Sequence, residues 1–300
     1  MGSNAVKVKT AAQKELVKRF DGLCGRHGRW EVWADWITAA ACAISCAVDQ
    51  AHRKEREKIY RSIQEKYTES EMQAMGEMLG MLVEALEENP DQDFLGEVFM
   101  VLELSNEHNG QFFTPYDVCR AMTEITIGNA ADQVNQQGWI SVADPACGAG
   151  ALLIAFANEC RRPGRDVNYQ TSVLFVAQDI DFIVGLMCYI QLSFLGCAGY
   201  VVIGDTIAHP STALDRRGLI PRDDGNVWYT PMFCHSIWHW RRMAAVVDLM
   251  CGPQESSHKP PKGPAKRRKA EGEKTPDETL KAPETAVSFA ENEHGQLTLF

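Results

Sequence analysis

Asp144-Pro145-Ala146-Cys147-Gly148-Ala149-Gly150 is the stretch that decides the fold, and it directly follows the short apolar run 139–143. A strand that ends in an acidic residue and turns through closely spaced glycines into a helix is how doubly wound α/β proteins receive a nucleotide-like cofactor. The glycines let the backbone approach the ligand, and the helix expected at 151–160 presents its free N–H groups. The loop has no Gly-Lys-Ser/Thr ending, which argues against a phosphate-binding P-loop.

A second signature lies upstream, where residues 110–116 read Gly-Gln-Phe-Phe-Thr-Pro-Tyr. Together the two segments resemble the adenine-N6 DNA methyltransferases, most closely the modification subunits of type I restriction systems. The resemblance covers about 93 to 205, and it implies that the two segments enclose S-adenosylmethionine from two sides. The cofactor-binding residues that it implies in these segments are Gln111, Phe112, Phe113, Thr114, Pro115, Asp144, Pro145, Ala146, Cys147, Gly148 and Gly150.

The composition limits the number of domains, the mode of nucleic-acid binding and the state of the thiols. A chain of 300 residues with 45% hydrophobic content can form one sizeable domain with appendages or two small domains. The net charge of −10 argues against a protein that coats nucleic acid non-specifically, although it leaves room for a local basic groove. The ten cysteines show no close metal-type pairs and no signal-peptide pattern precedes them, so we expect reduced thiols and a cytoplasmic location.

Two further patterns bear on metals and membranes. His235 and His239 lie one helical turn apart beside Cys234, a spacing that can bind zinc. No third ligand is evident, so an aromatic-rich packing helix is the favoured interpretation and no metal is expected. The longest apolar run, 37–48, is too short to span a bilayer, and we expect it to form a buried helix rather than a membrane anchor.

Helical patterns fill the chain from about 10 to 107. Apolar residues recur every three or four positions along the first strong pattern, at Trp30, Trp33, Ile37, Ala41, Ile44 and Val48. Residues 52–66 mix charges of both signs, as on a solvated helix face, and further helices are expected at 70–88 and 94–105. Core packing of the tryptophans is favoured over stacking on a base. We therefore predict an N-terminal helical domain at 1–108.

Strands alternate with helices in the following part of the chain, with strands expected at 139–143, 172–177 and 200–203. This order predicts a parallel sheet with right-handed crossovers. Together with the resemblance, it predicts an α/β, Rossmann-like S-adenosylmethionine-dependent methyltransferase domain at 109–250. Residues 251–300 are rich in Pro, Lys, Glu and Ser, and they are predicted to form a disordered, charged tail.

Acidic residues follow three successive strands, where a doubly wound sheet binds its ligand. Asp144 is expected to organise the loop and face the methionine amino group. Asp179, with Asp181 as second choice, can accept both ribose hydroxyls. Asp205 resembles the family residue that contacts the cofactor's adenine amine. Any one of these residues could equally be a helix N-cap, but three at successive strand ends favour binding.

The catalytic motif of the resembled family is Asn-Pro-Pro-Phe/Tyr, in which the Asn accepts hydrogen bonds from the flipped adenine and the aromatic residue stacks on it. No Asn-Pro-Pro occurs in this chain, and the nearest candidate is the run 229–233, Tyr-Thr-Pro-Met-Phe. In that register the catalytic candidates are Thr230, Pro231 and Phe233. A Thr hydroxyl lacks the reach and planarity of an amide. Because the charged tail begins soon afterwards, we expect a truncated methyltransferase domain.

The final residues, Gln296-Leu297-Thr298-Leu299-Phe300, closely resemble the short peptide by which bacterial DNA polymerases and repair proteins dock on the replication sliding clamp. An extended apolar peptide on a mobile tether can insert Leu299 and Phe300 into a hydrophobic pocket while Gln296 fixes the register and Leu297 adds apolar contact. An ordinary frayed terminus is an equally weighted alternative.

These observations predict a type I-like, S-adenosylmethionine-dependent DNA adenine-N6 methyltransferase that acts on DNA. A full enzyme of this type would need a separate specificity subunit to choose its site. A second hypothesis is a catalytically inert cofactor- and DNA-associated module, recruited to the sliding clamp, which the missing Asn-Pro-Pro favours. A third is methylation of another acceptor by the same fold, since a fold does not fix the acceptor.

Overall fold

The computed structural model describes residues 9–102, 104, 113–165, 167–222, 226–251 and 296–298. Its sheet has the strand order β4-β3-β2-β1-β5. The strands are β1 (Ile140–Asp144), β2 (Val173–Asp179), β3 (Ala198–Ile203), β4 (Val227–Tyr229) and β5 (Gln296–Thr298). The first three strands are parallel, as the alternating pattern predicted, and β5 is parallel to β1. β4 runs antiparallel to β3 at the opposite edge of the sheet.

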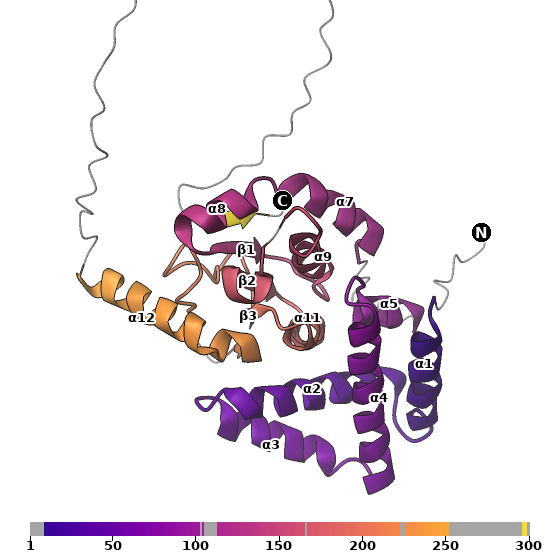
Figure 1. The fold of residues 1–300 in the computed structure, drawn as a ribbon. Coiled ribbons are helices and arrows are strands. Elements are labelled where there is room, and N and C mark those ends of the chain that lie inside the picture. Colours follow the sequence, from indigo (N-terminus) through magenta and orange to yellow (C-terminus); the bar gives the residue numbers. More distant parts are fainter. Residues whose placement is uncertain are drawn as a thin grey trace, which may run out of the picture.

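The parallel strands are apolar along their whole length because both faces of the sheet are covered. Val173, Phe175 and Ala177 point into one core, whereas Leu174 and Val176 of the same strand point into a second core on the other face. The helices α7 (Tyr116–Thr126), α8 (Ala130–Gln137), α9 (Ala151–Cys160), α10 (Tyr169–Ser172) and α11 (Phe182–Phe194) contribute to the first core. The short helix η1 (Pro231–Cys234) and α12 (Ser236–Cys251) cover the second face (Figure 1).

The N-terminal part of the chain is helical, as predicted. Its helices are α1 (Ala11–Leu23), α2 (Arg29–Val48), α3 (Arg53–Gln64), α4 (Glu69–Glu88) and α5 (Phe94–Val101). Capping boxes at Thr10 and Thr68 fix the starts of α1 and α4. Trp33 and Trp36 of α2 are fully buried, with their rings 5.2 Å apart in an edge-to-face arrangement. The core interpretation is therefore confirmed for Trp33, whereas Trp30, at the start of the predicted stripe, is only partly buried against the same core.

α2 is long and apolar enough to cross a membrane by length and composition alone. However, more than half of its most apolar window is buried inside the protein, and core helices of soluble proteins pass the same test. Its buried side chains pack in the common core with α1, α4 and α11. The helix is accounted for by this packing.

A buried arginine joins the helical layer to the sheet. Arg56 of α3 donates to Asp49 (2.7 Å), to Ser45 and to the backbone carbonyl of Val227 in β4 (2.5 Å). Its guanidinium also lies 4.1 Å from the ring centroid of Trp228. One continuous hydrophobic core runs from α1 to the sheet. The domain boundaries at residues 108 and 250 stay predictions.

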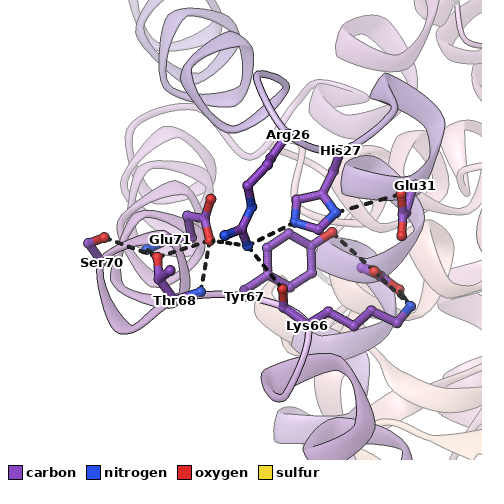
Figure 2. A network of polar contacts seen from close by, with 9 residues as sticks. Arg26, His27, Glu31, Lys66, Tyr67, Thr68, Ser70 and Glu71 are labelled. Atoms are coloured by element: carbon purple, nitrogen blue, oxygen red, sulfur yellow. Dashed lines mark hydrogen bonds and ion pairs between the residues drawn. The ribbon is translucent and has the colours of Figure 1, made fainter.

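A second polar network joins the turn between α1 and α2 to the turn between α3 and α4 (Figure 2). Lys66 and the hydroxyl of Tyr67, in the turn between α3 and α4, both donate to Asp35 of α2 at 3.0 Å. Arg26, between α1 and α2, donates to Glu71 near the start of α4 (3.3 Å). These contacts connect α2 and the turn before it to the start of α4 and the turn before that helix.

Candidate functional site

A cavity of about 270 Å³ lies at the carboxyl ends of β1 and β2, beside the first turns of α9 and α11. This is the edge at which a parallel α/β sheet receives its ligand. The polar and aromatic members of its wall are Asp93, Phe113, Thr114, Asp144 and Asp179. Ala146, Cys147 and Gly148 of the glycine loop complete that side of the cavity.

The glycine loop adopts a conformation that needs its glycines. Gly148 and Gly150 have φ values of +54° and +96°, in the left-handed region that side chains disfavour. A Cβ on Gly150 would lie 2.9 Å from Sγ of Cys188, and one on Gly148 would lie 3.4 Å from the Phe113 ring. The loop is also tied to β2, because the Cys147 N–H donates to the Gln178 carbonyl (3.0 Å). The loop conformation is therefore set by its glycines and by its hydrogen bond to β2.

Asp179 holds the loop from the end of β2. One carboxylate oxygen accepts a hydrogen bond from the Gly148 N–H at 2.8 Å, and the other accepts from the Asp181 N–H at 2.9 Å. A carboxylate has about four lone-pair sites, so two remain for a ligand. Asp181, by contrast, caps α11 by accepting from the Val184 N–H (3.0 Å). The structure thus favours Asp179 over Asp181 as the ribose-binding candidate.

Two further carboxylates of the cavity are buried. Asp144 is 2% exposed, and within the described chain its carboxylate accepts one hydrogen bond, from the Ala146 N–H (3.1 Å). Burial raises the pKa of Asp144 to about 6, and the charge of Asp179 adds to this rise. Burial likewise raises the pKa of Asp93 to about 6, against the lowering effect of its hydrogen bonds. The cavity therefore favours a ligand that brings positive charge.

Asp93 was not among the predicted site residues. It caps α5 through the Gly96 N–H (3.0 Å) and also accepts from the amide of Gln191 on α11 (2.8 Å). The Gln191 amide donates as well to the Ala149 carbonyl in the glycine loop (2.9 Å). The sequence signals only a helix cap at Asp93, because its neighbours in the cavity come from distant segments.

The upstream signature meets the glycine loop as expected. Phe113 and Thr114 line the cavity, and the Phe113 ring lies against Gly148 and against Phe99 of α5, with the two ring centroids 5.5 Å apart. Pro115 is the N-cap residue of α7 and stands just outside the cavity wall. The predicted residues Gln111 and Phe112 lie outside the described residues.

Three other predicted cofactor residues are not in the cavity wall: Pro145, Gly150 and Asp205. Gly150 acts through the loop conformation. Pro145 accepts from the Thr206 hydroxyl (2.5 Å) and faces a separate hollow. Asp205 is exposed and accepts from the N–H groups of Ile207 (2.8 Å) and Ala208 (3.1 Å). The structure therefore gives Asp205 the role of organising a turn.

The catalytic candidates at 230–233 are also placed away from the cavity, and this corrects the prediction. β4 lies beyond β3, so the run that follows it ends at the amino end of β3. The Thr230 hydroxyl is fully buried there, donating to the Cys197 carbonyl (2.7 Å) and accepting from the Gly199 N–H (3.0 Å). Phe233 is buried in the second core, and Pro231 begins η1. All three residues are structural because strand polarity sends them to the wrong end of the sheet.

His235 and His239, the pair with the spacing that can bind zinc, lie at the end of η1 and in α12. Trp238 is fully buried, as a packing helix requires, whereas Trp240 is 70% exposed. Within the part of the chain that the structure describes, no group of three His, Cys, Asp or Glu side chains is placed to hold a metal ion.

Residues 91–226 match the family model of the N-6 DNA Methylase family, and this region of the chain belongs to that family. The match includes every residue of the cavity wall and stops before β4. The chain thus carries a domain of the DNA adenine-N6 methyltransferase class. No curated protein matches the chain.

Proposed function

We propose that this protein is an S-adenosylmethionine-dependent DNA adenine-N6 methyltransferase of the type I-like group, with its cofactor in the cavity beside the glycine loop. The observation that carries the proposal is the meeting of Asp93, Asp144 and Asp179 with that loop inside the family-matched region. S-adenosylmethionine has a sulfonium and an ammonium group, so a cavity lined by three carboxylates complements its charge.

The residues present fit this cofactor. Asp179 has lone pairs left for the ribose hydroxyls while it holds the Gly148 amide. Asp93 and Asp144 offer buried acceptors to the ammonium group, and the Phe113 ring gives an apolar wall. When bound, the cofactor supplies an activated methyl group for transfer from sulfur to an adenine amine.

Cofactor binding is tested by isothermal titration calorimetry of the full chain with S-adenosylmethionine. We expect Asp179→Asn to weaken binding at least about tenfold, because a charge-assisted hydrogen bond is worth about 1.5–3 kcal/mol. Asp205→Asn is the matched control, and it should bind like the wild type because Asp205 is exposed outside the cavity wall. Absence of binding to the wild type would overturn the proposal.

Methyl transfer is tested separately with tritiated cofactor and DNA, followed by digestion and detection of N6-methyladenine. The expected result is label in DNA adenine. Cofactor binding without transfer to any acceptor would instead support the inert, clamp-recruited module, and label in RNA or protein would support another acceptor.

We further propose that the last five residues dock on a sliding clamp, as a partner contact additional to DNA and a specificity subunit. The support is the sequence Gln296-Leu297-Thr298-Leu299-Phe300 itself. In the structure 296–298 form the edge strand β5 paired with β1, so docking on the clamp requires β5 to leave the sheet, and 299–300 lie outside the described residues. Peptides that dock on grooves are bound in extended conformations. Surface plasmon resonance on immobilised clamp should show binding that Leu299→Ala with Phe300→Ala abolishes.

A further inference from the structure

A second cavity lies at the amino end of the sheet, away from the glycine loop. It has a volume of about 310 Å³ and is formed by α12, by Trp139 just before β1 and by residues 214–220. Leu219, Ile220 and Ala245 give it an apolar wall, and two arginines, Arg217 and Arg241, stand among them. We call this cavity the arginine groove.

The two arginines are held in place by aromatic rings and backbone carbonyls. The Arg217 guanidinium lies 3.7 Å from the ring centroid of Trp139, and the Arg241 guanidinium lies 4.4 Å from that of Trp238. Arg217 donates to the Trp139 carbonyl (3.2 Å), while Arg241 donates to the carbonyls of Thr171 (2.5 Å) and Gly138 (3.0 Å). Ligand binding would therefore cost little side-chain entropy.

Hydrogen-bonding capacity remains on both arginines. A guanidinium has five N–H donors, and the bonds of Arg217 and Arg241 use only some of them. The Arg217 Nε–H is buried and has no hydrogen-bond partner among the described residues. An oxyanion is the ligand that guanidinium donors recognise best.

Two arginines and two aspartates line the groove, but among the described residues the guanidinium groups of the arginines are not paired with a carboxylate. In the described part of the chain, neither arginine forms an ion pair with a carboxylate within 4.0 Å. Burial lowers the pKa of Arg241, and the positive charge of Arg217 lowers it further. Asp215 lines the groove, but its carboxylate oxygens accept from the backbone N–H groups of Arg217 (2.9 Å) and Leu219 (2.7 Å). Asp248, also in the wall, is exposed.

We propose that the arginine groove binds the phosphate group of a nucleotide-class ligand, with Arg217 and Arg241 holding the phosphate and the apolar wall contacting the rest of the molecule. The volume suits a ligand of this size. The groove and the cofactor cavity share no wall residue, so this site is independent of the proposed methyltransferase chemistry.

The test is isothermal titration calorimetry of the full chain with inorganic phosphate and with dAMP. Both should bind, dAMP more tightly because of the apolar wall. Arg217→Gln and Arg241→Gln should each weaken binding at least about tenfold. Arg216→Gln removes an exposed charge in the same segment and should leave binding unchanged. Ala244→Glu, at an exposed wall position, should block the groove without disturbing the arginine–tryptophan stacks.

Two further arms separate the sources of the phosphate and the two sites. A DNA duplex that displaces dAMP identifies the phosphodiester backbone as the source, whereas a duplex that does not compete identifies a free nucleotide. Asp179→Asn should bind dAMP like the wild type, so a failed cofactor site leaves this test intact. No binding to the wild type, or equal binding to the Arg217→Gln and Ala244→Glu variants, would overturn the proposal.

Discussion

Replacing Asp144 with asparagine should stabilise the ligand-free protein at neutral pH while it weakens cofactor binding. Burial raises the pKa of Asp144 to about 6 from its ordinary value of 3.8. A rise of about 2 pH units corresponds to about 3 kcal/mol, at 1.36 kcal/mol per unit. The asparagine oxygen can still accept the Ala146 N–H, so the variant removes the buried charge and keeps the local hydrogen bond.

The pH dependence distinguishes this cause from a general packing effect. Because the pKa is raised in the folded state, this carboxyl disfavours folding only where it must ionise. The free energy of unfolding of the wild type therefore falls as pH rises from about 4 through about 6, and the fall is complete at pH 7.5. Asp144→Asn should melt about 6–12 °C higher than the wild type at pH 7.5, and the difference should vanish near pH 4.

Differential scanning calorimetry of the ligand-free proteins between pH 4 and 8 provides the measurement. Asp132→Asn on α8 is the control, because Asp132 is exposed and its removal should change the melting temperature little. With saturating S-adenosylmethionine at pH 7.5, the order should reverse, since only the wild type offers the carboxylate to the cation. A pH-independent difference between Asp144→Asn and the wild type would refute the reasoning.

Three other substitutions test the site and the frame around it. Gly148→Ala, at φ +54° and against the Phe113 ring, should destabilise the protein by about 1 kcal/mol and weaken cofactor binding, as read by calorimetry. Thr230→Val should lower the free energy of unfolding by about 1–3 kcal/mol, seen as a lower melting temperature. Methyl transfer by the folded fraction should not fall. Loss of transfer from fully folded Thr230→Val would restore a catalytic role. Arg56→Met removes one charged partner of the buried Asp49, which keeps its contact with His52 (2.8 Å), and should cost about 1.5–3 kcal/mol in urea unfolding.

The sequence predicted the cofactor half of the fold because the signals there are local. The glycine loop, the strand before it and the helix after it are contiguous, and β1 and α9 appear within a residue of their expected bounds. The same holds for Asp179, whose place at the end of β2 follows from chain order and parallel pairing.

The placement of the 230–233 run could not be predicted in this way. Its prediction as a catalytic motif came from its likeness to the family motif, whereas β4 pairs antiparallel with β3 and sends the run to the end of the sheet opposite the cavity. Strand order depends on tertiary packing, here on the burial of Trp228 against Arg56 and of Phe233 in the second core. Asp93 was missed for a related reason, since only the fold brings it to the glycine loop.

The buried side chain of Gln191 couples α5 to the glycine loop. Its buried amide bonds to Asp93 and Ala149 and accepts from the Leu95 N–H (3.1 Å), so one side chain connects α5, α11 and the glycine loop. A local fluctuation that frees α5 must break these bonds and disturb the loop at once. Ligand binding at the loop should therefore slow amide hydrogen exchange in α5 as well as in α9, and the helical layer and the sheet should melt as one cooperative unit.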